Sequence, residues 1–192
     1  MKKLLFIPML FACYMSLGQG GGPKIGDSYG GGLVFYIVRF WEPGYDPNTP
    51  HGLIAATVDQ GIGVMWGDYA TITGSTATSV GTGLSNTNMT VTAQGSTPIS
   101  YGNVYGETVN SYAAGLARAY RGGGYSDWYL PSKDELNKLW VNRTVIGVTD
   151  FRNYWSSSEC SQVLTWEQNF QDGLQQQSSK GGQNYVRAIR SF

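Results

Sequence analysis

Histidine and cysteine are scarce in this chain of 192 residues, which contains one histidine and two cysteines. Cys13 lies in an N-terminal stretch with the features of a secretion signal, so Cys160 is the one cysteine expected after export. A single cysteine excludes an intramolecular disulfide. With His51 as the sole histidine, the composition argues against a zinc site of the usual Cys/His type, and a Ser-His-Asp triad would have to use His51.

Charged side chains are also few, and neither sign dominates: 13 Lys and Arg residues stand against 13 Asp and Glu residues. Loss of Lys2 and Lys3 with the signal would leave 11 basic against 13 acidic side chains. No basic cluster is present, which argues against a nucleic-acid partner. The same balance gives no general attraction to anionic glycans or lipid surfaces.

Long apolar runs are absent as well. Leu4–Ala12 is too short to span a bilayer, which takes about 20 residues, but it fits the apolar part of a signal peptide covering residues 1–18. An alternative is a lipobox ending at Cys13, which would leave that residue acylated at a new N-terminus. Either way we expect an exported protein, secreted or at the cell surface, without a transmembrane span.

Residues 19–192 suit a single domain, in which residues 19–30 form a flexible lead-in. Apolar or alternating runs bounded by turn residues predict strands. These runs are Leu33–Val38, Leu53–Val58, Tyr154–Glu159, Val163–Phe170, Leu174–Gln177 and Tyr185–Phe192. The dipeptide Asp172-Gly173 predicts a tight hairpin between two of them. Thr71–Gly106, rich in Thr, Ser, Gly and Asn, is interpreted as a long irregular excursion with short strands.

Two helices are predicted. In Glu107–Arg121, apolar residues recur at helical spacing, and three glycines follow. The second helix begins after Ser132, which together with Glu135 fits a capping box, and ends before Val145. Trp128 and Tyr129 precede this helix and serve either as core residues or as an aromatic surface presented to a ligand.

The candidate ligand-binding residues are aromatic side chains, which can stack on sugar rings, and carboxylates, which can accept hydrogen bonds from hydroxyls. They are Asp127, Trp128, Tyr129, Trp155, Glu159, Trp166 and Asp172. Each tryptophan is also a candidate core residue, because tryptophans are highly buried on average. Arg187 and Arg190 are expected to form structural salt bridges, with Glu159 or Asp172 as partners.

Several segments, taken in order, resemble one family of bacterial surface-protein domains. They are Gly31–Tyr36, His51–Ala56, Asp127–Ser132 with Glu135-Leu136, Tyr154–Glu159 and Val186–Arg190. The sequence from about Gly26 to Phe192 is similar to the Lcl-type C-terminal domain family, named after a collagen-like adhesin and formerly a domain of unknown function.

The resemblance implies an α+β, C-type-lectin-like fold, with two helices packed on a twisted antiparallel sheet, long irregular loops, and first and last strands lying together. It also implies an exported domain, and the namesake adhesin binds sulfated glycans. This chain has no collagen-like repeat and no basic surface to reward sulfate. It lacks the cysteine pair of formylglycine-generating enzymes, which share the fold superfamily, and the Glu-Pro-Asn, Gln-Pro-Asp and Trp-Asn-Asp triplets of calcium-dependent lectins.

Three functions remain open at this level. The first is a non-catalytic recognition domain that binds glycan or another surface macromolecule. The second is a structural or assembly module of the cell envelope that binds protein. The third is a glycoside hydrolase using Glu159 and Asp172 as its carboxylate pair. No cofactor is required by any recognisable motif, although calcium could be held by loop oxygens.

Overall fold

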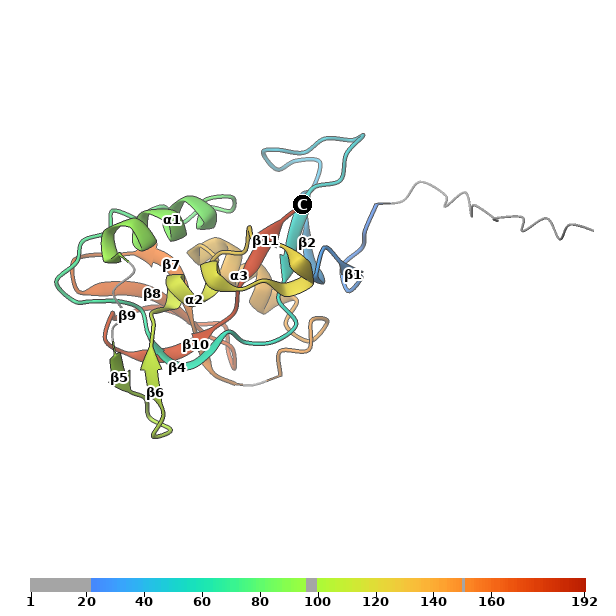
Figure 1. Ribbon diagram of the computed structural model, residues 1–192. Helices are drawn as coiled ribbons and strands as arrows, with labels where there is room; N and C mark the ends of the chain where they lie inside the picture. Colours follow the sequence, from blue (N-terminus) through green and yellow to red (C-terminus); the bar gives the residue numbers. More distant parts are fainter. Residues whose placement is uncertain (1–21, 96–99, 150) are drawn as a thin grey trace, which may run out of the picture.

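The computed structural model describes residues 22–95, 100–149 and 151–192, so the expected signal peptide and Cys13 lie outside the described residues. The chain is α+β, with helices and strands interleaved along the sequence (Figure 1). In chain order, the strands before the first helix are β1 (Ser28–Tyr29), β2 (Gly32–Ile37), β3 (Gly52–Ala55) and β4 (Gly61–Met65). The middle of the chain contains α1 (Gly83–Gln94), β5 (Ser100–Gly102), β6 (Thr108–Asn110), α2 (Ala113–Ala119), the short 3-10 helix η1 (Gly122–Gly124) and α3 (Lys133–Val141). The last strands are β7 (Asn153–Glu159), β8 (Leu164–Asn169), β9 (Gln175–Ser179), β10 (Gln183–Val186) and β11 (Ile189–Ser191).

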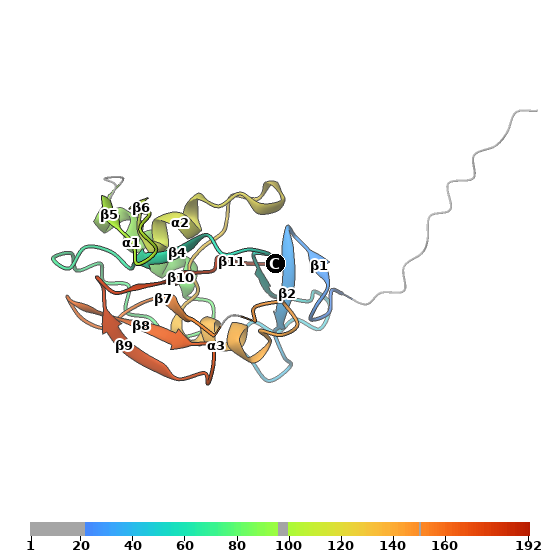
Figure 2. The ribbon, with the colours of Figure 1, turned by 90° about the horizontal axis from the view of Figure 1, so that it is seen from below.

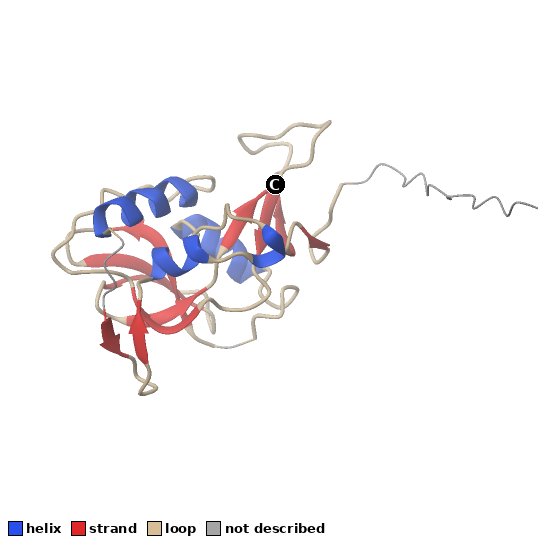
Figure 3. Cartoon of the chain, in the orientation of Figure 1, coloured by secondary structure: helices blue, strands red, loops and turns tan. Residues whose placement is uncertain are grey.

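A small antiparallel sheet joins the two ends of the described chain, in the order β1-β2-β3-β11. Strand β3 therefore separates β2 from β11, and all three lie close together beside the marked C-terminus in Figure 1. Ser28 and Tyr29, expected as part of a flexible lead-in, instead pair with Leu33 and Gly32 of β2. The loop between β2 and β3 projects away from the rest of the described chain (Figure 3).

The larger sheet has the order β4-β10-β7-β8-β9 and is mixed, because β10 runs parallel to β7 while the other pairs are antiparallel. Seen from below, it forms the layer on the side of the molecule away from the small sheet (Figure 2). The predicted hairpin at Asp172-Gly173 is present and connects β8 to β9, but its loop is longer than the tight turn expected. Residues 170–174 separate the strands, and the Gly173 amide donates to the Asn169 carbonyl at 2.8 Å. Gly173 has a φ of 84°, a left-handed conformation that suits glycine, and it lies against the ring of Trp140.

Helix α3 is the element that the sequence predicts most closely. Its capping box is present: the Glu135 amide donates to Ser132 Oγ, and the Ser132 amide donates to Glu135 Oε2 at 2.7 Å. The predicted helix over 107–121 is shorter than expected, because Thr108–Asn110 form a strand and α2 begins only at Ala113. Ala113, Ala114 and Ala117 of α2 are buried against the core, whereas Ala119 is exposed.

The interpretation of Thr71–Gly106 as an irregular excursion is wrong where α1 lies. This helix has no apolar stripe, because its buried residues include Asn86, Thr87 and Thr90. Thr87 Oγ1 accepts a bond from the Leu130 amide at 3.0 Å and donates to the Leu130 carbonyl at 3.2 Å, while Asn86 donates to the Ala77 carbonyl. Hydrogen bonds thus fix the helix to the segments around Leu130 and Ala77, while it packs beside α2 and β7.

The core contains two apolar clusters. Trp66, Trp128 and Trp155 are fully buried in the first, and the second forms around Phe35, Leu139 and Phe170. None of the helices in the described residues is long and apolar enough to cross a membrane.

The polar interior is unusual for its fully buried lysine, Lys180, whose Nζ lies 2.5 Å from Glu159 Oε1.

Candidate functional site

Most of the aromatic candidates chosen from the sequence lie in the core. Trp128, Tyr129 and Trp155 are 0 to 2% exposed, so their rings pack against protein and offer no face to a ligand in this conformation. Trp155 Nε1 donates to the Val64 carbonyl at 2.6 Å. Trp166 is half-buried, and the Lys133 ammonium lies 4.3 Å above its ring, which covers one face.

The acidic candidate Asp127 is engaged by an arginine. Its two carboxylate oxygens accept from Arg190 Nε and Nη2, each at 2.8 Å, a bidentate geometry. Arg190 thereby lowers the pKa of Asp127. The expectation of salt bridges for both arginines is confirmed, but the partners differ from those expected, because Arg187 pairs with Asp59 at 2.6 Å.

Glu159 and Asp172 lie far apart, which contradicts the requirement of a hydrolase pair. Glu159 pairs with Thr165 at one end of the β7–β8 ladder, whereas the turn containing Asp172 follows Asn169 at the other end. The strand between Thr165 and Asn169 spans roughly 13 Å, and glycosidase carboxylates lie roughly 5–10 Å apart. Asp172 caps its own turn by accepting from the Leu174 amide.

Glu159 is also held as the anion of a buried ion pair. Burial opposes its ionisation, but the Lys180 ammonium and the backbone amides of Thr73 and Gly74 outweigh that effect and lower the pKa of Glu159. A buried carboxylate held as the anion of an ion pair is a structural group, unsuited to act as a general acid.

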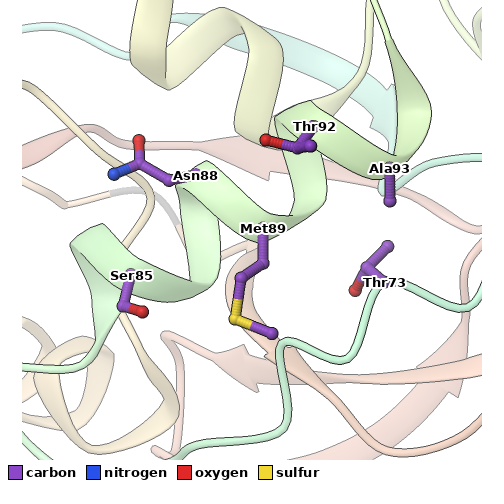
Figure 4. A pocket seen from close by; sticks show the side chains of 6 residues that line it. All are labelled: Thr73, Ser85, Asn88, Met89, Thr92 and Ala93. Carbon is purple, nitrogen blue, oxygen red and sulfur yellow. The ribbon is translucent and has the colours of Figure 1, made fainter.

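A hollow of about 410 Å³ lies along α1 (Figure 4). It is lined by Thr73, Ser85, Asn88, Met89, Thr92 and Ala93. The Met89 side chain extends across it toward the segment that contains Thr73 (Figure 4). Its lining has neither an aromatic ring nor a charged group, so a sugar bound there would have no ring on which to stack.

A second hollow, of about 260 Å³, is smaller but chemically richer, and we refer to it as the asparagine cleft. Its walls come from the β5–β6 turn, the start of β7 and strand β10. They consist of Tyr105, Phe151, Arg152, Asn153, Gln183, Asn184 and Tyr185. Aromatic rings, amides and one guanidinium thus converge on a space suited to a small polar group.

The rings and amides of the cleft are held by contacts that reach across the fold. Tyr105 and Tyr185 hydroxyls lie 3.2 Å apart, and the Arg152 guanidinium lies 5.9 Å from the Tyr185 ring. Gln183 Oε1 accepts from the Val104 amide at 2.7 Å, which ties β10 to the turn of the β5–β6 hairpin. Tyr105 and Phe151 remain 50% and 67% exposed, so their ring faces are available to a ligand.

A buried carboxylate lies behind the cleft. Glu167, 3% exposed, accepts from Asn153 Nδ2 at 2.8 Å, Gln176 Nε2 at 2.7 Å and Asn184 Nδ2 at 2.5 Å. No cationic side chain of the described residues forms a salt bridge with Glu167. Three amide groups therefore compensate this charge, and two of them belong to residues that line the cleft.

The sequence patterns predict neither the cleft nor a second exposed aromatic group. Phe40 and Trp41, in the projecting β2–β3 loop, are 74% and 61% exposed, with ring centroids 4.6 Å apart. Their position in a Pro- and Gly-rich loop was the available signal, because loop aromatics have no strand or helix to bury them. The Asn153–Glu167–Asn184 contacts have no comparable signal, because they join separate strands.

The oxygen groups of the site do not form a recognisable metal centre. Among the residues that the structure describes, no group of three or more His, Cys, Asp or Glu side chains is arranged to hold a metal ion. His51, at the start of β3, instead lies 3.3 Å from the Phe192 carbonyl through Nδ1.

The sequence motifs agree with one family. A sequence model of the Lcl C-terminal domain matches residues 55–190, more than half of the chain. The chain belongs to the Lcl C-terminal domain family. Membership places it among domains of bacterial surface proteins, as the resemblance of its motifs predicts. A search of curated proteins finds no match to the chain.

Proposed function

We propose that this Lcl C-terminal domain is an exported, non-catalytic recognition domain that binds carbohydrate in the asparagine cleft. The observation that carries the proposal is the composition of that cleft: exposed rings at Tyr105 and Phe151 beside the amides of Asn153, Gln183 and Asn184. Rings that stack on the C–H face of a sugar and amides that bond its hydroxyls are the two elements such recognition needs.

Within the described residues, the separation of the two candidate carboxylates supports recognition over catalysis. The carboxylate pair considered from the sequence is separated along β7 and β8, and Glu159 is committed to Lys180. Glu167 is close to the cleft, but its oxygens accept from three amides. The rings of the cleft would bind a sugar without transforming it.

The test is a glycan-array screen of the purified protein, followed by titration of the best ligand against single variants. Tyr105→Ala and Phe151→Ala remove exposed rings of the cleft, and we expect each to weaken binding by about 1–3 kcal/mol, or roughly 5- to 150-fold. Trp41→Ala is the matched control, since it removes an exposed ring outside the cleft.

A blank array with folded protein, or equal losses in all three variants, would contradict the proposal. Thermal unfolding of each variant separates lost binding from lost structure. Because Tyr105 and Phe151 are exposed, we expect their removal to change the free energy of unfolding by less than about 1 kcal/mol.

A second function, assembly with an envelope protein, is favoured by one separate observation. Phe40 and Trp41 form an exposed apolar pair on the projecting loop, the kind of group that anchors protein interfaces. If Trp41→Ala abolishes association with envelope proteins while cleft variants do not, the loop is the recognition surface and carbohydrate binding loses its support.

A further inference from the structure

The buried carboxylate of Glu167 determines how the two asparagines present themselves to the cleft. An ionised carboxylate has no hydrogen to donate and can only accept. Its contacts with Asn153 and Asn184 must therefore come from their NH₂ groups, as the geometry has them at 2.8 and 2.5 Å. The usual ambiguity between the oxygen and nitrogen of an amide is removed by this partner.

With both NH₂ groups turned toward Glu167, the carbonyl oxygens of Asn153 and Asn184 are left to other partners. Within the described part of the chain, no hydrogen bond reaches either Oδ1 atom, and neither atom is among the buried polar atoms that lack a partner. Both residues line the cleft. Their carbonyl oxygens are thus in contact with solvent and available as fixed acceptors.

We infer that Glu167 is a positioning residue and that the ligand of the cleft is an uncharged, hydroxyl-rich glycan rather than a sulfated one. The inference rests on the proposed function and names its ligand class. Sugar hydroxyls can donate to the two carbonyl oxygens and accept from the remaining amide hydrogens. A sulfate group only accepts, so it would meet the carbonyl dipoles and the Glu167 charge without bonding to them.

Arg152 is the one cationic residue that lines the asparagine cleft, and it does not reverse the preference for an uncharged glycan. Its guanidinium is exposed and lies over Tyr185, so solvent screens its charge. The charge of Glu167 is shielded less, because that side chain is 3% exposed. The near-neutral balance of the chain adds no long-range attraction for a polyanion.

The experiment measures Kd by titration calorimetry for cellohexaose, mannohexaose and β-1,4-galactohexaose against a heparin-derived hexasaccharide, using wild-type protein, Glu167→Gln and Glu107→Gln. Glu107 is a matched control, because it also accepts from an asparagine amide, Asn103 at 3.1 Å, but neither residue lines the cleft. Thermal unfolding shows which variants are folded.

We expect wild-type protein to bind at least one neutral hexasaccharide and to bind the heparin fragment at least tenfold more weakly. Glu167→Gln replaces one acceptor oxygen with a donor, which turns one asparagine amide around, and should raise the neutral Kd at least tenfold. Glu107→Gln should leave both constants within twofold.

Two results overturn the inference while leaving carbohydrate recognition intact: equal or tighter binding of the heparin fragment by wild-type protein, or an unchanged neutral Kd in folded Glu167→Gln. The wild-type comparison decides the ligand class even if Glu167→Gln fails to fold. Failure of every hexasaccharide to bind wild-type protein overturns the proposed function itself, and the inference with it.

Discussion

Replacing Lys180 with methionine should expose how strongly the interior depends on one ion pair. Lys180 is fully buried, and its Nζ donates to Glu159 Oε1 at 2.5 Å and to the Thr71 carbonyl at 2.8 Å. The same Nζ lies 4.9 Å from the centroid of the Trp66 ring. Methionine matches the length of the side chain but leaves Glu159 as a buried, unpaired charge. Breaking a buried pair in this way costs about 3–5 kcal/mol.

The structure indicates the lower end of that range. Glu159 keeps its bonds from the backbone amides of Thr73 and Gly74 after the lysine is removed. We therefore expect a loss of about 3 kcal/mol, which for a domain of this size lowers Tm by roughly 6–12 °C.

The assay is urea unfolding followed by tryptophan fluorescence, with Lys133→Met as the control. Lys133 lies over Trp166 at the surface, and removing that contact should cost less than about 1 kcal/mol. A loss below about 1 kcal/mol in Lys180→Met, or equal losses in the two variants, would refute the reasoning. The double variant Lys180→Met, Glu159→Gln should recover part of the loss, because it removes the stranded charge.

The same pair predicts a pH dependence. Lys180 and two backbone amides hold the pKa of Glu159 below its usual value near 4.5, despite the opposing effect of burial. A carboxyl with a lowered folded-state pKa stabilises the fold above its unfolded pKa, and that stability is lost as pH falls through the folded pKa. Unfolding measured from pH 7 downward should show a decline beginning near pH 4.5, and Glu159→Gln should flatten it.

Three further predictions follow from single contacts. Ser132→Ala removes the cap of α3 and should cost about 1–2 kcal/mol in urea unfolding; no loss would mean that the capping box is dispensable. Thr87→Val leaves the amide and carbonyl of Leu130 without a partner and should cost about 1–3 kcal/mol of unfolding free energy. The control, exposed Thr92→Val, should cost less than about 0.5 kcal/mol. Similar losses in the two variants would contradict the role of hydrogen bonds in fixing α1. Burial raises the pKa of the Cys160 thiol to about 11. Iodoacetamide at pH 8 should therefore label it at least about a hundredfold more slowly than a free thiol. Rapid labelling would show that the thiol is less buried.

Features set by neighbouring residues could be predicted from the sequence. The cap of α3 needs only Ser132 and Glu135, three residues apart, and Asp172-Gly173 marks the position of the β8–β9 turn, although not its length. In both cases the chemistry is local and independent of the rest of the fold. The partners of Arg187 and Arg190 were not predictable, because Asp59 and Asp127 approach them only through the final topology.

Helix α1 and the asparagine cleft escaped prediction for a shared reason: their organising contacts are polar and distant in sequence. The buried face of α1 carries Asn86 and Thr87, so it lacks the apolar stripe by which helices are recognised. Glu167, between Trp166 and Gln168, has the pattern of an exposed strand position. Its burial depends on amides supplied by three other strands.

Trp128 and Trp155 are buried, so the abundance of aromatic residues did not predict where a ligand could bind. Abundant aromatic residues suggested a stacking surface near α3, but those rings fill the core, and the most exposed rings of the described residues, at Phe40, Trp41, Phe151 and Tyr105, lie elsewhere. The core rings define the family motifs, while the exposed ones lie outside them. For this chain, the residues that carry the resemblance position the candidate site without forming it.

The most direct test of carbohydrate recognition in the cleft is an NMR titration of ¹⁵N-labelled protein with the glycan that binds most tightly on the array. The account predicts saturable shifts in the side-chain amides of Asn153, Asn184 and Gln183, and none at the Trp41 indole. Shifts centred on Trp41, or on the α1 hollow around Asn88, would contradict it and move recognition to another surface.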